Sequence, residues 1–412
     1  MTFHRPITVL SVLRVHPLFR RLWVGALLSG LGDVLSSLAL PWYVLDQTGR
    51  GDLVGALLLC FALPALVTGP LWGQAMDRFQ PRRLMLFDNG ARAIVFLLIP
   101  ALAILGRVEL FVVFAVAVMA GALAPATQIG VRLFIPALLS DHELEQGNAA
   151  YSLTMQLPIV FGPMLAGALI GVWGVTATLL VNAGTFVLMA WSLLTMPNIP
   201  RGREPALQGD RAPKAPRWPA IVRATLGLTT LFYFVYGPFE VALPVFARAT
   251  LTADALNYGL LWSALGVGTL FGSVLVSVLS RNGRLQGVLA WIMALWGSVM
   301  VLLAFTSNIP FALAVMLLGG VIWGPYTALE TTLLQRSVPA HTYGRLLGLR
   351  TMLLGPAAPL GTAIGGLLLV SMSANRVLVL SGLACVLGAA VAWPWMRGRP
   401  VQPVAEPEYE AR

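Results

Sequence analysis

Long apolar segments alternate with short polar segments along the whole chain. Each apolar segment is continuous over some 20 residues or more, without the regular alternation of apolar and polar positions that marks a strand. A helix needs about 20 residues to cross the ~30 Å hydrocarbon core of a bilayer, whereas a strand of a membrane barrel needs only about 9–11. The pattern therefore predicts an all-α membrane protein with twelve transmembrane helices. The predicted spans are 22–45, 53–76, 84–105, 110–138, 149–172, 175–196, 221–247, 256–279, 285–305, 311–335, 346–370 and 377–395.

One long polar segment interrupts this pattern near the middle of the chain. Residues 198–220 are rich in Pro, Arg and Ala, a composition typical of a flexible linker, and they leave six spans on either side. We therefore expect an N-terminal six-helix bundle (1–197), a cytoplasmic linker (198–220), a C-terminal six-helix bundle (221–396) and a cytoplasmic tail (397–412).

The arginines and the single lysine are distributed unevenly between the two sides of the predicted membrane. With the N-terminus inside, twenty of them lie in cytoplasmic segments and four in external segments. Cytoplasmic loops of membrane proteins carry an excess of Lys and Arg. Both termini are therefore predicted to be cytoplasmic. The first apolar run has no cleavage site of small residues after it, so we expect an uncleaved helix rather than a signal peptide.

Composition agrees with a protein that has lipid as its solvent. Hydrophobic residues make up 58% of the chain, charged residues 11%, and the mean hydropathy is +0.80; soluble domains are typically about half apolar and about a quarter charged. The net charge of +10 does not indicate a nucleic-acid partner, because no basic stripe interleaved with aromatic residues exists. The two cysteines and four histidines lack metal-ligand spacing, and nucleotide-binding or hydrolase motifs are missing. We expect no enzymatic activity, no cofactor and no metal.

Short matches relate the two halves of the chain. The tripeptide Ala-Leu-Pro at 39–41 recurs at 242–244, and Pro-Ala-Thr at 125–127 corresponds to Pro-Tyr-Thr at 325–327. The offsets are 203 and 200 residues, close to half the chain length. Two bundles related by a parallel repeat are a known layout of membrane transporters.

The turn between the second and third predicted spans concentrates a small residue, an acid and several arginines. It reads Gly73-Gln-Ala-Met-Asp77-Arg78-Phe-Gln-Pro-Arg82-Arg83. The spacing G-x-x-x-D-R, followed closely by R-R, resembles the corresponding loop of the major facilitator superfamily. The resemblance implies a gate in which Asp77 docks on the start of span 11, near Arg345, in the outward-open state. An acid at a helix N-terminus is stabilised there by the aligned peptide dipoles.

Further segments are similar to the branch of this superfamily that contains macrolide efflux proteins and enterobactin exporters; they lie at 19–33, 125–128 and 335–345. In span 5, Gly162-Pro163-Met-Leu-Ala-Gly167 resembles the end of the antiporter motif of drug–proton exchangers, with an alanine in place of one glycine. A packing motif of small residues would have the same sequence pattern.

Seven ionisable residues lie inside the predicted spans and away from their ends, where a charge costs at least about 2.5–3.5 kcal/mol unless it faces a cavity or a partner. They are Asp33, Asp88, Arg92, Arg132, Glu240, Glu330 and Arg350. Asp88 and Arg92 are four residues apart, which predicts an intrahelical ion pair. Arg132 has two possible partners, Glu330 across the bundle interface or Asp77 in the gate motif, and the sequence leaves both open.

Polar residues at helical spacing occupy one face of spans 1, 4, 7 and 10. They are Ser29, Asp33, Ser36, Gln128, Tyr233, Tyr236, Glu240, Trp323, Tyr326 and Glu330. These spans line the central cavity in the superfamily, so the resemblance implies that the residues face the substrate path. The alternative is that the serines and aromatic residues are helix–helix contacts.

Asp33, near the middle of span 1, is the first candidate for proton coupling, and Glu240, nearer the outside, is the second. Intramembrane carboxyl groups form proton relays in pumps and transporters. A carboxylate that faces the cavity also attracts cationic substrates, so substrate loading and protonation can compete for one group.

These observations predict a secondary transporter of the bacterial inner membrane that exports amphipathic small molecules in exchange for protons by alternating access. We expect a monomer, with the lipid bilayer, the small-molecule substrate and protons as its partners. The alternatives are a proton-coupled uptake carrier for a nutrient and, from another class, a non-transporting membrane sensor or scaffold.

Overall fold

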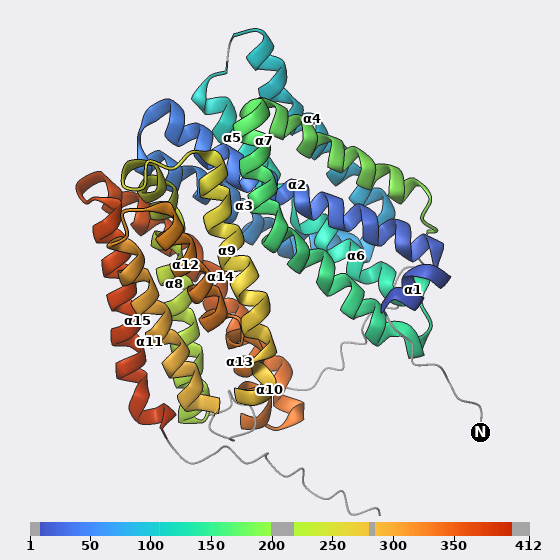
Figure 1. Cartoon of the computed structure of the whole chain (residues 1–412). Helices are drawn as coiled ribbons and strands as arrows, with labels where there is room; N and C mark the ends of the chain where they lie inside the picture. The colour runs from blue at the N-terminus through green and yellow to red at the C-terminus, as the bar shows by residue number, and fades with distance from the viewer. Residues whose placement is uncertain (1–8, 107, 199–217, 280–284, 398–412) are drawn as a thin grey trace, which may run out of the picture. The chain divides into compact units, whose positions relative to one another are not determined.

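The computed structural model describes residues 9–106, 108–198, 218–279 and 285–397, and nearly all of them are helical (Figure 1). The helices before the predicted linker are α1 (Val9–Val15), α2 (Pro17–Thr48), α3 (Gly51–Arg78), α4 (Pro81–Ile104), α5 (Leu110–Leu123), α6 (Pro125–Leu138), the short 3-10 helix η1 (Asp141–Glu143) and α7 (Leu144–Leu194). Those after it are α8 (Ala220–Ala249), α9 (Ala255–Val274), α10 (Val276–Leu279), α11 (Leu285–Ala304), α12 (Ile309–Trp323), α13 (Tyr326–Ser337), α14 (Ala340–Ser371) and α15 (Ala374–Met396). Most of the predicted linker and tail lies outside the described residues.

Among the described residues, ten helical segments are long and apolar enough to cross a membrane. One of them extends over Asp141–Leu194 and has 54 residues, more than one crossing requires. Inside it, Gly174 has φ 80° and ψ 172°, which interrupts the helical backbone. Glycine adopts this positive φ readily because it has no Cβ. The interruption falls between the predicted spans 149–172 and 175–196.

The spans expected over 110–138 and 311–335 correspond to the apolar segments Leu110–Leu138 and Ile309–Ser337, and each of these contains two helices. The breaks lie at Ala124 and at Gly324, next to Pro125 and Pro325. Proline has no N–H to donate to the preceding turn, and its ring crowds the carbonyl four residues earlier. Ala124 and Gly324 both keep helical dihedral angles, so each break is a kink rather than a turn.

By its internal contacts the chain separates into two compact units. Unit 1 comprises Met1–Gly49, Leu57–Gln208 and Asp254–Ser263; unit 2 comprises Arg50–Ala56, Gly209–Ala253 and Ala264–Arg412. Each unit is described separately below.

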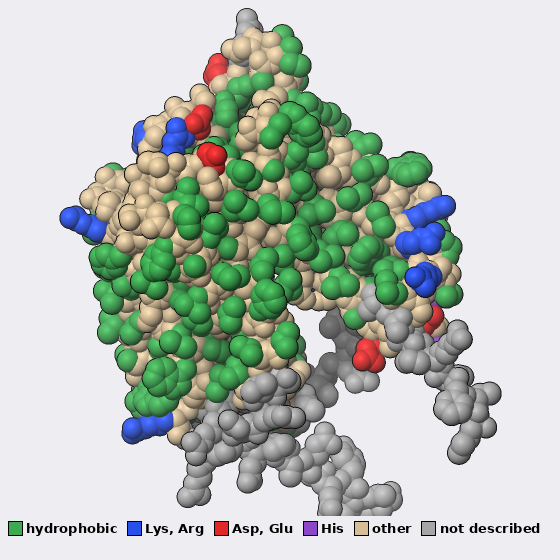
Figure 2. Space-filling model, in the orientation of Figure 1, with side chains coloured by type: hydrophobic (Ala, Val, Ile, Leu, Met, Phe, Trp, Pro, Cys, Tyr) green, Lys and Arg blue, Asp and Glu red, His purple; other side chains and the backbone are tan. Residues whose placement is uncertain are grey.

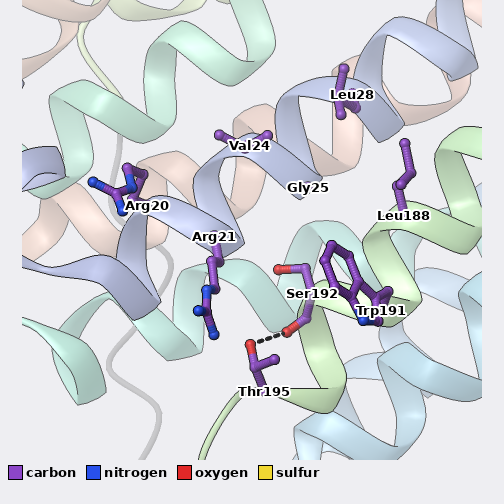
Figure 3. A pocket seen from close by; sticks show the side chains of 9 residues that line it. All are labelled: Arg20, Arg21, Val24, Gly25, Leu28, Leu188, Trp191, Ser192 and Thr195. Atoms are coloured by element: carbon purple, nitrogen blue, oxygen red, sulfur yellow. Dashed lines mark hydrogen bonds between the residues drawn. The ribbon is translucent and has the colours of Figure 1, made fainter.

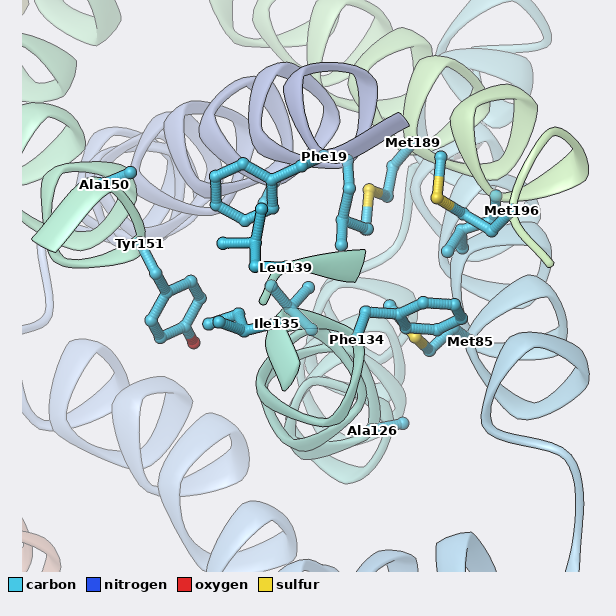
Figure 4. Packing of buried hydrophobic residues seen from close by; sticks show 14 of the residues in the cluster. Phe19, Met85, Ala126, Phe134, Ile135, Leu139, Ala150, Tyr151, Met189 and Met196 are labelled. Carbon is cyan, nitrogen blue, oxygen red and sulfur yellow. The ribbon is translucent and has the colours of Figure 1, made fainter. Parts of the chain in front are cut away.

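In unit 1, α7 packs along α2 and α4, and α6 packs against the same helices. Their contact is a cluster of buried apolar side chains that includes Phe19, Met85, Phe134, Tyr151 and Met189 (Figure 4). Between membrane helices such packing stabilises their association through close van der Waals contact. The hydrophobic effect contributes little there, because lipid is as apolar as the side chains. The cluster fixes α2, α4, α6 and α7 relative to one another.

In unit 2, α8 packs against α14 and α15, and α11 packs against α15 and α12. The contact between α8 and α14 is made at the level of the backbone. A Cβ at Gly361 would collide with the carbonyl of Phe234, and one at Gly237 would collide with the backbone at Gly361 and Thr362. Only glycine fits these positions, a common device where membrane helices approach closely.

Large apolar side chains remain exposed on many helices of both units; examples are Val67, Val172, Leu367 and Leu387. Hydrophobic side chains cover most of the face drawn in Figure 2, and the charged side chains lie toward its margins. A water-soluble protein rarely exposes so large an apolar surface. The surface is therefore that of a protein embedded in lipid.

Candidate functional site

A small cavity of about 40 Å³ lies inside unit 1, between α2, α4, α6 and α7. Its polar lining consists of Ser29, Asp33, Arg92, Thr127, Gln128 and Tyr151. The space holds a few water molecules at most. The cavity therefore has room for water or one small polar group, but not for a whole drug-sized molecule.

The guanidinium of Arg92 binds two carboxylates at the edge of this cavity. Its Nε and Nη2 donate to Oδ1 and Oδ2 of Asp88 at 2.8 and 3.2 Å, and its Nη1 donates to Oδ1 of Asp33 at 2.9 Å. Asp88 lies one turn before Arg92 on α4, as its spacing predicts, whereas Asp33 comes from α2. The charged cluster of Asp33, Asp88 and Arg92 thus links the two helices.

The two carboxylates of the charged cluster have different surroundings. The Asp88 side chain is fully buried and also accepts a hydrogen bond from the Thr127 hydroxyl, which in turn accepts one from Asn89 at 2.7 Å. The Asp33 side chain is 42% exposed and accepts one hydrogen bond from Arg92. Asp88 is the fixed partner of Arg92, and Asp33 is the one that faces the cavity.

The charged cluster carries one more acid than base. Two carboxylates share one guanidinium, whose other face lies 4.2 Å from the ring centroid of Phe186. When both acids are ionised the formal charge is −1, and one proton or one bound cation neutralises it. In a low-dielectric interior an uncompensated charge is costly, so the cluster favours that uptake.

Unit 2 contains a second buried ion pair. Arg350 on α14 donates from Nε and Nη2 to both oxygens of Glu330 on α13, at 3.0 and 2.9 Å. The Glu330 side chain is 1% exposed and that of Arg350 24%. Tyr233 lies beside this pair. The fork of two parallel bonds neutralises Glu330.

Aromatic rings form a stack next to the pair. Trp323 lies between Phe232 and Tyr326, with centroid distances of 3.5 and 4.3 Å. Tyr326 is buried and its hydroxyl bonds to Thr229 at 2.9 Å. Trp323, Tyr233 and Tyr236 are only half-buried. Tyr326 thus packs inside unit 2, while Trp323, Tyr233 and Tyr236 are partly exposed.

Glu240, the second candidate for proton coupling, lies on α8 and is half-buried. Its carboxylate makes no hydrogen bond or ion pair with any residue that the structure describes. A carboxylate without a counter-charge in a membrane helix is costly. Glu240 is therefore a second acid whose charge no described residue compensates.

The structure brings only some of the predicted residues together. Ser29, Asp33 and Gln128 line the same cavity, whereas the Ser36 hydroxyl donates to the backbone carbonyl of Asp33 within its own helix, at 3.0 Å. Glu330 has Arg350 as its partner, and the guanidinium of Arg132 lies 5.6 Å from the ring centroid of Tyr151.

The gate motif extends over the end of α3 and the start of α4. A Cβ added at Gly73 would meet open space, and Asp77, Arg78 and Arg83 are exposed. Arg82 donates from Nη2 to the carbonyl of Leu194 at 2.8 Å, at the C-terminus of α7. A cation at this end of a helix is stabilised by the helix dipole. Arg345 is exposed on the first turns of α14.

The antiporter-like segment is a place of close helix packing. A Cβ at Gly167 would collide with the backbone of Ala255 and Leu256 on α9, and one at Gly162 with the side chain of Val34 on α2. Pro163 is buried inside α7. The geometry matches that of a small-residue packing motif.

Sequence reasoning missed several members of these sites. Asp88 and Arg92 were expected to neutralise each other, but Arg92 also binds Asp33. Asn89 and Phe186, which support the charged cluster, carry no sequence signal of their own, because they act through neighbours that are distant in the chain. Arg350 was noted as an intramembrane charge without a partner. Among the described residues, no group of three or more His, Cys, Asp and Glu side chains is arranged to hold a metal ion.

Comparison with known proteins was made by sequence and by structure. The family model of the Major Facilitator Superfamily matches residues 22–355 and 225–412. The multidrug efflux pump Tap of Mycolicibacterium fortuitum is 26% identical over 382 residues, which cover 89% of this chain and 93% of that protein. The enterobactin exporter EntS of Shigella boydii is 27% identical over 393 residues, which cover 93% of this chain and 91% of that protein.

Two solved structures show the same fold. One is a bacterial homologue of the iron transporter ferroportin in an inward-facing state, with a TM-score of 0.73 and 19% identity, over 92% of this chain and 98% of the other. The second is the nucleoside transporter NupG, with a TM-score of 0.68 and 12% identity, over 93% of this chain and 100% of the other.

Proposed function

Because the chain belongs to the Major Facilitator Superfamily, in its efflux branch, we propose that it exports amphipathic small molecules, cationic ones in particular, in exchange for protons. It is a multi-pass membrane transporter, and the proposal concerns its cargo, its coupling ion and its direction. We also propose that the protein is a monomer, that it has twelve transmembrane helices in two bundles, and that both termini are cytoplasmic. Dividing Asp141–Leu194 at Gly174 and adding the 20-residue helix α9 to the ten apolar segments supports the number twelve.

The observation that carries the proposal is that Arg92 is shared between a buried carboxylate and one that faces a cavity. Asp88 holds the guanidinium by two bonds, and Asp33 holds it by one. When Asp33 is protonated, Arg92 remains neutralised by Asp88. When Asp33 is ionised, the cluster has a surplus negative charge that a cationic substrate can neutralise. One site can therefore accept either a proton or a cation, which is the requirement for exchange.

The proposed cycle uses this competition. Substrate enters from the cytoplasm while Asp33 is ionised, the two bundles rock about the midplane, and protonation of Asp33 or Glu240 releases the substrate outside. The proton then leaves inward. The cavity at Asp33 is too small for the substrate itself, so we place only its charged end there. The half-buried rings of Trp323, Tyr233 and Tyr236 in unit 2 stay predicted substrate contacts.

The relatives support the outward direction. Tap carries the name of a multidrug efflux pump and EntS that of an enterobactin exporter, and both are similar to this chain over about nine-tenths of its length or more. An importer of the same fold would use the same cluster with the flux reversed.

The test is transport by purified protein in liposomes with an imposed pH gradient. The compounds are a cationic dye, a macrolide and a catecholate siderophore. We expect gradient-driven accumulation of the cation, which disappears in Asp33→Asn and weakens in Glu240→Gln. The matched control is Glu109→Gln, which removes an acid from the exposed start of α5.

Three results contradict the proposal. Accumulation that is unaffected by both Asp33→Asn and Glu240→Gln would contradict the assignment of proton coupling to these two acids. Accumulation of the compounds only under the opposite pH gradient would favour the uptake carrier. No movement of any compound, with the protein correctly inserted, would favour the sensor or scaffold.

A further inference from the structure

A groove of about 320 Å³ opens between the first turns of α2 and the last turns of α7, in unit 1 (Figure 3). Arg20, Arg21 and Val24 line it from α2, and Leu188, Trp191 and Ser192 line it from α7. Arg21 precedes Asp33 by twelve residues on the same helix, or about 18 Å at 1.5 Å per residue. The groove is therefore separate from the cavity of the charged cluster.

The groove has a cationic end and an apolar end. Arg20 and Arg21 are exposed, and neither forms an ion pair with an acid in the part of the chain that the structure describes. In Figure 3 they lie at one end, while Leu28 and Leu188 lie at the other. The side chains of Val24, Leu188 and Trp191 are 42%, 46% and 68% exposed. This pairing of free guanidinium groups with exposed apolar side chains matches an amphiphile that carries an anionic head.

A buried polar atom lies on the floor of the groove. Ser192 is 7% exposed, and its Oγ has no hydrogen-bond partner among the described residues. The hydroxyl faces α2 at Gly25, where a Cβ would lie 3.4 Å from it. A buried hydroxyl without a partner is costly, especially in a membrane where no bulk water reaches it. Ser192 thus offers an unused donor on the side of α7 that faces the arginines.

A third cation lies close to the same end of α7. The Arg82 guanidinium binds the carbonyl of Leu194, two residues after Ser192. Its Nε is buried and has no partner among the described residues. The local charge is therefore positive, and it lies at the end of the helices that the arginine distribution assigns to the cytoplasm.

We propose that this groove binds an anionic phospholipid of the cytoplasmic leaflet, with its headgroup phosphate between Arg20 and Arg21 and its acyl chains along Val24, Leu188 and Trp191. Guanidinium groups form paired bonds to phosphate oxygens, and aromatic residues such as Trp191 favour the membrane–water interface. The volume lies at the lower end of the range of ligand sites, ~300–1,000 Å³. It suits a headgroup with the first part of its chains, while the rest of the chains stay in the bilayer.

Native mass spectrometry of the full-length protein in detergent tests the proposal. Phosphatidylglycerol is titrated against the wild type, against R20Q/R21Q and against R223Q/R336Q. The last variant is the matched control, because it removes two exposed arginines from unit 2. Each arginine near an anionic lipid contributes about 1 kcal/mol, so losing two predicts an affinity for phosphatidylglycerol about 30-fold lower. Ser192→Ala removes the donor while keeping the size, and we expect weaker binding of the same lipid.

The controls separate the lipid from other ligands. We expect zwitterionic phosphatidylcholine to bind weakly, with no difference between the variants, and glycerol 3-phosphate, a headgroup without chains, not to be retained. Equal affinity of R20Q/R21Q and R223Q/R336Q for phosphatidylglycerol would overturn the proposal, as would equal binding of the two lipids by the wild type. Retention of glycerol 3-phosphate with wild-type affinity would indicate a site for soluble anions instead. Equal unfolding temperatures of the two double variants without lipid establish that the difference is one of binding.

Discussion

The charged cluster predicts different effects for two substitutions that both replace an aspartate by asparagine. Asp33→Asn and Asp88→Asn each remove one negative charge from a carboxylate that binds Arg92. Asp33 contributes one hydrogen bond and its side chain is 42% exposed, whereas Asp88 contributes two, accepts a third from Thr127 and is fully buried. The first substitution should therefore affect mainly transport, and the second mainly stability.

The magnitudes follow from burial and from the number of bonds. Removing one partner from a buried, hydrogen-bonded ion pair costs about 3–5 kcal/mol, and we expect about 3 kcal/mol for Asp88→Asn because Asp33 remains beside Arg92. A single hydrogen bond contributes about 1 kcal/mol, and Arg92 keeps both of its bonds to Asp88 when Asp33 is replaced. Asp33→Asn should therefore lower the free energy of unfolding by no more than about 1 kcal/mol, while gradient-driven accumulation is lost.

Denaturant titration in detergent micelles measures the free energy of unfolding, and accumulation in liposomes with a pH gradient measures transport. Glu109→Gln, at an exposed position, should change neither. If Asp33→Asn destabilised the protein as much as Asp88→Asn, both acids would be structural partners of Arg92. The distinction between a fixed and an exchanging carboxylate would then be wrong.

Three further predictions concern other parts of the structure. Glu330→Gln leaves Arg350 without its counter-charge, next to a buried amide, and should lower the free energy of unfolding by about 3–5 kcal/mol in the same denaturant titration. A change below about 1 kcal/mol would show that Arg350 is solvated in the absence of Glu330. Gly361→Val places a side chain against the carbonyl of Phe234 and should abolish stable expression. Gly348→Val on the same helix, where the space is open, should not. Equal yields of the two variants after detergent extraction would contradict the close contact of α8 and α14. Asp77→Asn should slow transport without weakening substrate binding; loss of equilibrium binding with normal membrane insertion would count against a gate.

Much of this fold is encoded in features that act locally along the chain. Helix positions follow from continuous apolar runs, and the break at Gly174 lies where two runs meet. The kinks at Pro125 and Pro325 were not predicted, because proline is tolerated inside membrane helices and its effect depends on how neighbouring helices satisfy the freed carbonyls. The apolar pattern therefore locates the helices but does not determine their curvature.

Side-chain partners were harder to predict than helices, for a physical reason. The Asp88–Arg92 pair was found from spacing because both residues lie on one helix and are one turn apart. The bond between Arg92 and Asp33 depends on how α2 packs against α4, and that packing is determined by a cluster of side chains drawn from several helices. The same applies to Glu330, whose partner is separated from it by a turn between two helices. Sequence spacing identifies pairs within a helix, and only the packed structure identifies pairs between helices.

The two halves share a scheme of charge that neither the repeat matches nor the motifs revealed. In the first half Asp33 and Asp88 both bind Arg92, and in the second Glu330 binds Arg350 while Glu240 lies on α8 without a partner among the described residues. In each half one acid is buried and bound by two parallel bonds, which leaves one surplus carboxylate.

The surplus acids differ in how they are held, and that difference assigns their roles. Asp33 keeps a bond to its arginine, so its ionised form is partly compensated and it can exchange its proton for a cation without a large cost in either state. Glu240 has no such partner among the described residues, so its ionised form is the more costly one. We therefore expect Asp33→Asn to have a larger effect on coupling than Glu240→Gln in the liposome assay.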